Sequence, residues 1–156
     1  MVKKILLALV AFLLLIQLVR PARNETTAQA PDALKAHYPL PDSVEAILKV
    51  ACYDCHSNNS RYPWFDKVAP VSWWVAYHIR GGKRHLNFDT FYALPVKRKV
   101  KRLQDVAETV EDGSMPLPPY TWAHKDAILT PAQKTILTDW ARGLRRQIAD
   151  TSQTSF

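Results

Sequence analysis

Cysteine is scarce in this sequence: the chain of 156 residues contains only Cys52 and Cys55. A disulfide between them would close a loop of only a few residues, and the chain-entropy model gives such a loop little stabilising value. A zinc site would need two further ligands at short spacing, and the nearest histidine pair, His78 and His85, is too widely spaced for a zinc finger. No strand-like alternation surrounds the cysteines, which argues against a thioredoxin-like redox pair. The sequence therefore disfavours the common structural and redox roles of a cysteine pair.

The two cysteines belong to the run Cys-Tyr-Asp-Cys-His over residues 52–56. Two cysteines separated by two residues and followed at once by histidine are typical of c-type haem attachment. Both sulfurs can form thioethers to the haem vinyl groups, and the adjacent imidazole can reach the iron from one face. The run therefore predicts one covalently attached haem c, with Cys52 and Cys55 as its tethers and His56 as an iron ligand.

Methionine is equally scarce, because Met115 is the only one besides the initiator. It lies in a proline-rich loop over residues 113–120, and stiff prolines would hold its sulfur near the iron at a small ordering cost. A thioether is a soft, neutral ligand, and a His/Met pair raises the reduction potential of a haem. We expect Met115 to be the second axial ligand. A methionine that fills an apolar gap is the structural alternative, and the nearby His124 is the rival distal ligand.

Acidic residues number 14 against 21 basic residues, which gives a formal net charge of +7. Residues 1–30 hold part of this excess, and the rest of the chain carries 17 basic and 13 acidic residues. Two ionised haem propionates would reduce the remaining charge to about +2. This balance makes nucleic acid a poor candidate for the partner.

Five basic residues gather at the start of a predicted helix over residues 96–112, while acidic residues crowd its end. The basic residues are Lys97, Arg98, Lys99, Lys101 and Arg102. Their position opposes the helix dipole, so a reason other than helix stability could favour it. One interpretation is a docking patch for an acidic redox partner or for anionic lipid headgroups. A solvated helix face explains the pattern equally well.

Residues 5–19 form an apolar run that only Gln17 interrupts, with lysines before it and arginines after it. A helix of this length spans roughly 22 Å, short of the roughly 30 Å hydrocarbon core, and snorkelling lysines nearly close the gap. No cysteine follows the run closely, which excludes a lipoprotein anchor. We predict an uncleaved signal anchor over residues 1–20, in preference to a signal cleaved near Ala30. Because bacteria attach c-type haem outside the cytoplasmic membrane, this single-pass protein is expected to face the periplasm.

The rest of the chain predicts an all-α domain. Residues 21–41 are rich in proline and form a predicted linker, residues 42–148 the haem domain, and residues 149–156 a flexible tail. Apolar residues recur at helical spacing in four segments of the domain: from Asp42 to Ala51, from Pro70 to a stop at Gly81-Gly82, from Val96 to Asp112 before Gly113, and from Pro131 to Ile148.

The order of these motifs is similar to that of class I cytochromes c, which bind a single haem. More closely, the chain resembles the bacterial haem-binding domain family of small membrane-anchored proteins. The matching motifs are residues 52–60, Tyr62-Pro-Trp, Pro70-Val-Ser-Trp-Trp, His78-Ile, Gly82-Lys, Leu86-Asn-Phe, Met115-Pro, Tyr120, His124 and residues 129–140. The resemblance covers about residues 38–146 and implies a cytochrome c-like domain with Cys52, Cys55, His56 and Met115 at the ligation positions. A tryptophan-rich insertion after His56 departs from ordinary class I proteins.

We therefore predict an electron-transfer protein rather than an enzyme. When His56 and Met115 occupy both axial positions, reaction at the iron is blocked and outer-sphere electron exchange remains. One alternative is a haem-dependent peroxidase, or a sensor of peroxide or gas, with a labile distal ligand. Another is a structural haem subunit of a respiratory complex.

Overall fold

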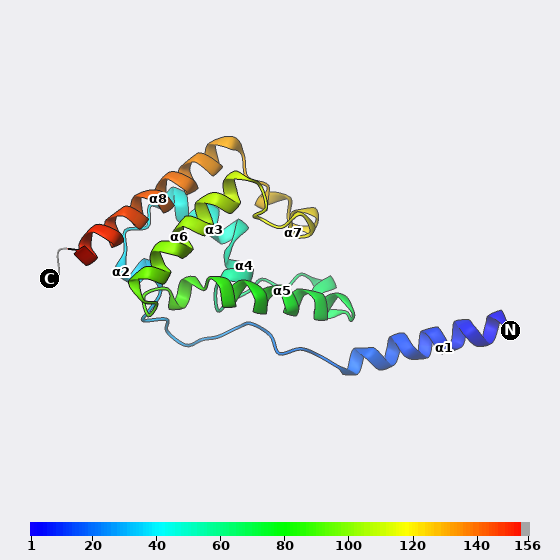
Figure 1. Ribbon diagram of the computed structural model, residues 1–156. Coiled ribbons are helices and arrows are strands. Elements are labelled where there is room, and N and C mark those ends of the chain that lie inside the picture. Colours follow the sequence, from blue (N-terminus) through cyan, green and yellow to red (C-terminus); the bar gives the residue numbers. More distant parts are fainter. Residues whose placement is uncertain (154–156) are drawn as a thin grey trace.

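The computed structural model of the protein describes residues 1–153, and over that range the chain forms helices and no β-strand (Figure 1). The centre of the molecule consists of α3 (Asp42–Ala51), α6 (Val96–Glu111) and α8 (Pro131–Gln153). Helices α6 and α8 lie side by side, and α3 packs against α8. The predicted all-α fold class is confirmed.

These three helices share one apolar core, because each carries a stripe of apolar side chains at helical spacing. The buried side chains come from the three helices and from three connecting segments: Leu34, Val44, Ile47, Leu48, Ala51, Leu86, Phe88, Phe91, Leu103, Ala107, Val110, Ala127, Leu129, Leu137, Ala141, Leu144 and Ile148. Leu48 and Phe91 are completely buried. The core therefore fixes the end of α3, where the Cys-Tyr-Asp-Cys-His run begins.

The ends of α6 and α8 follow local sequence signals. Helix α6 ends just before Gly113, which has the positive φ of 78° that a glycine after a helix adopts easily. Helix α8 begins after Thr130, whose Oγ1 accepts a hydrogen bond from the backbone N of Gln133 at 3.3 Å. The Gln133 side chain in turn accepts one from the backbone N of Thr130 at 2.9 Å. Helix α8 continues to Gln153, and residues 154–156 of the predicted tail lie outside the described residues.

Helix α5 (Val71–His85) corrects one prediction, because it does not stop at Gly81-Gly82. Both glycines lie inside the helix. A Cβ on Gly82 would lie only 2.5 Å from the carbonyl oxygen of Cys55, whereas one on Gly81 would meet nothing within 4 Å. Gly82 thus serves close packing of two helices rather than helix termination.

The remaining described elements are short, and the sequence did not predict them. They are α2 (Leu34–His37), α4 (Tyr53–His56), η2 (Trp64–Lys67), η3 (Phe88–Thr90), α7 (Pro118–Ala123) and η4 (Lys125–Ala127). The segment 21–41 contacts the domain: the Asn24 side chain donates to the Ser57 carbonyl at 2.9 Å and to Ser60 Oγ at 2.8 Å. The ring of His37 stacks on Tyr92 with 3.5 Å between ring centroids.

The predicted N-terminal membrane-anchor helix over residues 1–20 is wrong. Helix α1 (Val2–Leu15) has 14 residues and is followed by the short turn η1 (Ile16–Leu18). At 1.5 Å per residue α1 is roughly 21 Å long, against roughly 30 Å of hydrocarbon in a bilayer. Among residues 1–153 no helix combines the length and apolar character needed to cross a membrane. Gln17, which interrupts the apolar run, is instead hydrogen-bonded to the backbone N and O of Ala69 at 2.9 and 3.0 Å.

Candidate functional site

The Cys-Tyr-Asp-Cys-His run forms α4, a single turn that follows α3 after a bend at Cys52. Both cysteines carry free thiols. Burial, helped by the neighbouring Cys55, raises the pKa of Cys52 to about 12. Burial, helped by nearby carboxylates, raises the pKa of Cys55 to about 11. Both sulfurs are therefore protonated thiols at neutral pH in the folded chain.

Because their pKa values are raised, the thiols of Cys52 and Cys55 are expected to react slowly in the folded protein. The thiolate is the nucleophile, and raising the pKa of Cys55 from 9.0 to about 11 lowers its thiolate fraction at pH 8 by about 100-fold. We expect the folded, haem-free protein to react with iodoacetamide about 100-fold more slowly at pH 8 than the urea-unfolded chain, with a rate that rises until pH 11. Mass spectrometry measures the labelling, and helical circular dichroism confirms that the sample is folded. Equal rates for both samples would contradict the burial of these thiols.

The ring of His56 is oriented by one backbone contact. Its Nδ1 lies 2.9 Å from the carbonyl oxygen of Leu86, and because a carbonyl only accepts, Nδ1 carries the proton in this bond. Burial lowers the pKa of His56, although the backbone bonds to Leu86 and Gly82 oppose this effect. The ring is therefore neutral at pH 7, with a lone pair on Nε2. A neutral imidazole whose other nitrogen donates to a carbonyl is the usual form of a metal-binding histidine.

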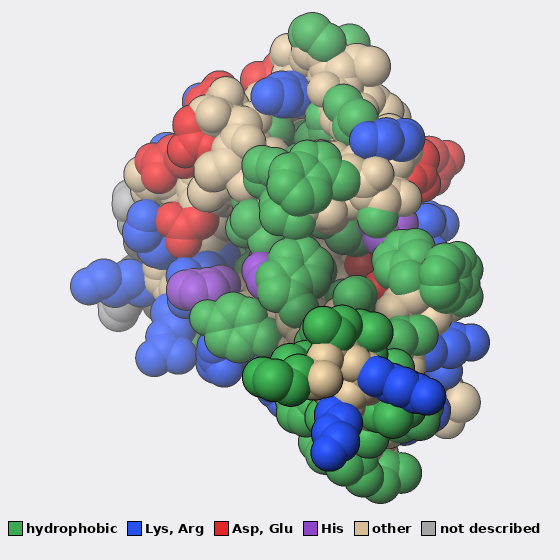
Figure 2. Space-filling model, turned by 90° about the vertical axis from the view of Figure 1, so that its right-hand side faces the viewer, with side chains coloured by type: hydrophobic (Ala, Val, Ile, Leu, Met, Phe, Trp, Pro, Cys, Tyr) green, Lys and Arg blue, Asp and Glu red, His purple; other side chains and the backbone are tan. Residues whose placement is uncertain are grey.

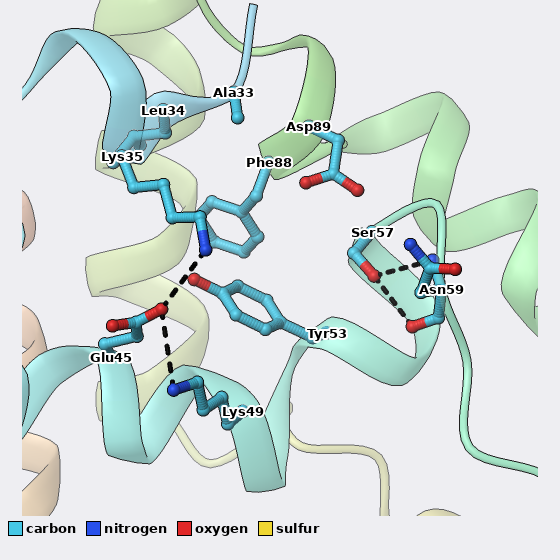
Figure 3. Close-up of a pocket in the computed structure, with 10 residues that line it drawn as sticks. All are labelled: Ala33, Leu34, Lys35, Glu45, Lys49, Tyr53, Ser57, Asn59, Phe88 and Asp89. Atoms are coloured by element: carbon cyan, nitrogen blue, oxygen red, sulfur yellow. Dashed lines mark hydrogen bonds and ion pairs between the residues drawn. The ribbon is translucent and has the colours of Figure 1, made fainter. Parts of the chain in front are cut away.

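The two middle residues of the run line different cavities: Tyr53 lines a smaller one and Asp54 a larger one. Tyr53 lies in a cavity of about 230 Å³, where its ring meets Phe88 edge-on with 5.6 Å between ring centroids (Figure 3). Glu45 lies in the same cavity and forms ion pairs with Lys35 at 3.5 Å and Lys49 at 3.6 Å. This cavity is small and charged, so it does not suit an apolar porphyrin.

A larger groove, lined by residues of α4, α5 and α7, has a volume of about 470 Å³. This volume falls within the range of cofactor pockets. Its apolar wall is made of Cys55, Phe65, Val71, Trp74, Val75, Ile79, Leu117, Pro119, Trp122 and Ala123. Figure 2 shows hydrophobic side chains gathered on the side of the molecule where α7 lies in Figure 1. The groove is thus the apolar cavity beside the cysteine run.

Asp54 connects the run to α7, which forms the opposite wall of the groove. Its carboxylate accepts a hydrogen bond from the Tyr120 hydroxyl at 2.7 Å. It also accepts bonds from the backbone N of Arg61 at 2.8 Å and from its Nε at 3.1 Å. The Asp54 side chain is only 9% exposed, so these charge-assisted bonds form away from bulk water. We call Asp54, Arg61 and Tyr120 the Asp54 cluster.

Two histidines line the groove. His78 on α5 has its Nδ1 2.9 Å from the Trp74 carbonyl. His124, just after α7, has its Nδ1 3.2 Å from the Tyr120 carbonyl, and its ring stacks on the Tyr120 ring with 4.2 Å between centroids. The Nε2 atom of His124 is buried and has no hydrogen-bond partner among the described residues. Burial, opposed by nearby His124, raises the pKa of the Asp66 carboxyl in the same groove.

The structure does not bring Met115 into the groove wall. The side chain is half-buried, and its backbone N donates to the Thr109 carbonyl at 2.9 Å. The groove lining from this loop begins at Leu117. Ligation of iron by Met115 therefore stays a prediction, while the rival His124 lines the groove.

The five basic residues predicted as a docking patch do not form one free surface. Lys99 is 7% exposed, and its ammonium lies 4.3 Å from the centroid of the Tyr92 ring. Lys101 and Arg102 form ion pairs with Asp105 at 2.6 and 3.2 Å. Lys97 and Arg98 are exposed and have no ion-pair partner within the described part of the chain. Only these two are free to meet a partner.

Comparison with known families decides the cofactor class. A model of the haem-binding domain family matches residues 11–143, which is most of the chain. The chain belongs to this family. The predicted family is thus confirmed and haem is its cofactor, while the more specific likeness to class I cytochromes c is not confirmed. No curated protein and no solved structure matches the chain significantly.

The residues of the groove fit a haem. Cys55 and His124, the latter with its buried, unpaired Nε2, line the groove itself. Cys52 and the neutral His56 ring belong to the same run as Cys55 but are not among the lining residues. No group of three or more histidine, cysteine or acidic side chains among residues 1–153 could hold a bare metal ion. Sequence reasoning missed the Asp54 cluster. Only the i,i+4 spacing of Tyr120 and His124 hinted at their stacking.

Proposed function

We propose that this haem-binding protein carries one haem c, attached through Cys52 and Cys55, and that it transfers single electrons. The observation that supports this most directly is the position of Cys55. Cys55 carries a free thiol and lines the apolar groove, while the next residue, His56, has its ring already oriented by the Leu86 carbonyl. His56 would bind the iron through Nε2, and the haem would supply the one-electron chemistry.

Electron exchange without substrate chemistry requires the chain to supply a ligand on both faces of the iron. The predicted second ligand Met115 and its rival His124 both belong to the segment 113–124. The apolar groove wall would exclude water from the porphyrin. Trp122 on this wall is 70% exposed, and Trp64, whose ring contacts that of the wall residue Phe65, is 77% exposed. A partner protein can therefore approach the mouth of the groove.

A haem peroxidase, or a sensor of peroxide or gas, is the second candidate function. The observation that favours it is that Met115 does not line the groove, whereas His78, His124 and Asp66 do. An iron without a strong second ligand would leave these polar groups free to exchange protons with a bound peroxide.

We also propose that the protein works on the periplasmic side of the cytoplasmic membrane, where bacteria attach haem c.

We further propose that the redox partner is acidic and contacts Lys97 and Arg98. Reversing the charges of both residues is then expected to slow electron exchange with an acidic flavodoxin about tenfold at low salt, and hardly at all at high salt. Stopped-flow absorbance measures these rates. A rate unaffected by charge reversal at low salt would rule out this contact.

The decisive experiment for the proposed function is expression with a c-type haem maturation system. The unchanged protein is expected to retain haem on a denaturing gel, and the C52S/C55S double variant is expected to lose it. The matched control Ser57→Ala, next to the run, should keep its haem. A double variant that still retains haem, or an unchanged protein that never acquires it, would refute covalent attachment.

Carbon monoxide then separates the two candidate functions. A closed electron carrier should give a low-spin ferrous spectrum that carbon monoxide leaves unchanged within minutes, because both axial positions are occupied. Prompt binding by the unchanged protein would mean an open distal position and would favour the peroxidase or sensor.

A further inference from the structure

We propose that His124, through its Nε2 atom, is the second axial ligand of the haem iron, opposite His56. This inference rests on the proposed function, since it needs a haem in the groove, and it replaces Met115 as the predicted distal ligand. Three observations on His124 carry it: an unpaired nitrogen, a fixed ring orientation and a position in the groove wall.

The first observation is the unpaired Nε2. A buried polar atom without a hydrogen bond costs about 1–3 kcal/mol, and folded proteins satisfy more than nine in ten such atoms. Among the buried side-chain nitrogen and oxygen atoms of the described residues, His124 Nε2 is the one without a hydrogen-bond partner. The neighbouring Asp66 is close enough to influence it, yet no hydrogen bond joins the two side chains. A ligand in the groove would give this nitrogen its missing partner.

The second observation is the orientation of the ring. The Tyr120 carbonyl accepts from Nδ1 of His124 at 3.2 Å, which leaves the lone pair on Nε2. The Leu86 carbonyl holds His56 in the same way at 2.9 Å. Metal-binding histidines almost always donate their second ring nitrogen to a carbonyl or carboxylate, and such outer contacts fix tautomer and direction. Stacking on Tyr120, itself bonded to Asp54, restrains the His124 ring further.

The third observation is position, and it separates His124 from its rivals. His124 lines the groove together with Cys55, whereas Met115 does not; His56, which directly follows Cys55 on α4, is not a lining residue either. His78 also lines the groove and has a similar Nδ1 contact, but its Nε2 is not a buried atom. A nitrogen open to water already has hydrogen-bond partners, so His78 lacks the energetic reason to bind iron and serves as the matched control.

The test compares H124A, H78A and M115A in the matured full-length protein by optical and electron paramagnetic resonance spectroscopy. We expect the unchanged ferric protein to show a low-spin bis-imidazole signal and no sulfur-to-iron charge-transfer band. H124A should become high-spin, should bind carbon monoxide at least 100-fold faster, and should return to low spin when imidazole is added. H78A and M115A should keep the unchanged spectrum.

A charge-transfer band in the unchanged protein, lost in M115A, would overturn the proposal in favour of a His/Met pair. Retention of the low-spin spectrum by H124A would also overturn it. If H124A does not fold, the spectrum of the unchanged protein alone decides between the two ligand pairs. Haem staining on a denaturing gel is recorded for every variant. An unchanged protein without covalent haem defeats the proposed function, whereas a stained protein with a His/Met spectrum defeats only the role of His124.

Discussion

Gly82→Ala is expected to destabilise the protein by about 1–3 kcal/mol and to lower the yield of attached haem several-fold. The new Cβ would lie 2.5 Å from the carbonyl oxygen of Cys55 and 3.1 Å from its carbonyl carbon and Cβ. These are mostly backbone atoms of α4, so they cannot move without displacing the cysteine run. Urea unfolding of the haem-free protein measures the stability, and haem staining measures attachment.

Gly81→Ala is the matched control, because it changes the adjacent residue of the same helix. A Cβ there meets nothing within 4 Å, and alanine favours a helix over glycine by about 1 kcal/mol. We expect G81A to be at least as stable as the unchanged protein and to attach haem normally. Equal behaviour of the two variants would show that Gly82 does not set the approach of α5 to α4.

Asp54→Ala is expected to cost about 2–3 kcal/mol, which is less than the sum of its hydrogen bonds because Arg61 is half exposed. The change leaves the Tyr120 hydroxyl and the Arg61 backbone N without their acceptor. It should also loosen α7 on the groove, so the attached haem should bind carbon monoxide faster than in the unchanged protein. Urea unfolding and stopped-flow absorbance measure the two effects.

Asp126→Ala provides the comparison for Asp54. Asp126 also pairs with Arg61, at 3.6 Å, but its side chain is 54% exposed. Exposed ion pairs contribute at most about 1 kcal/mol, so we expect a change of less than 0.5 kcal/mol and an unchanged groove. If both variants lose the same stability, the hydrogen bonds of Asp54 to Tyr120 and to the Arg61 backbone add nothing to the fold.

The sequence predicted best those features that nearby residues determine. The start of α8 depends on Thr130 and Gln133, and the end of α6 depends on Gly113, so each signal lies within a few residues of the boundary it sets. The periodicity of α6 also accounts for the burial of Lys99, because this lysine stands four residues before the buried Leu103 and shares its face.

Features that depend on contacts between distant segments could not be predicted. The sequence around Gly82 is typical of a helix end, but in the structure Gly82 lies inside α5, where α4 packs closely against it. Gln17 interrupts an apolar run in the sequence, and its role as a hydrogen-bond partner of Ala69 depends on a segment 52 positions away. Asp54 and Tyr120 are bonded across 66 positions. No local pattern reports such a pair, because its energy arises only when the chain has folded.

The burial of the two thiols bears on the order of events during biogenesis. A folded chain presents Cys52 and Cys55 as protonated, partly buried thiols, and these react slowly. The far wall of the groove, including Tyr120, is synthesised long after the cysteine run. Thioether formation would therefore belong to the nascent or transiently opened chain, and closure by the Asp54 cluster would then trap the product. The iodoacetamide experiment measures the same opening, so a fast-reacting folded chain would remove this constraint on timing.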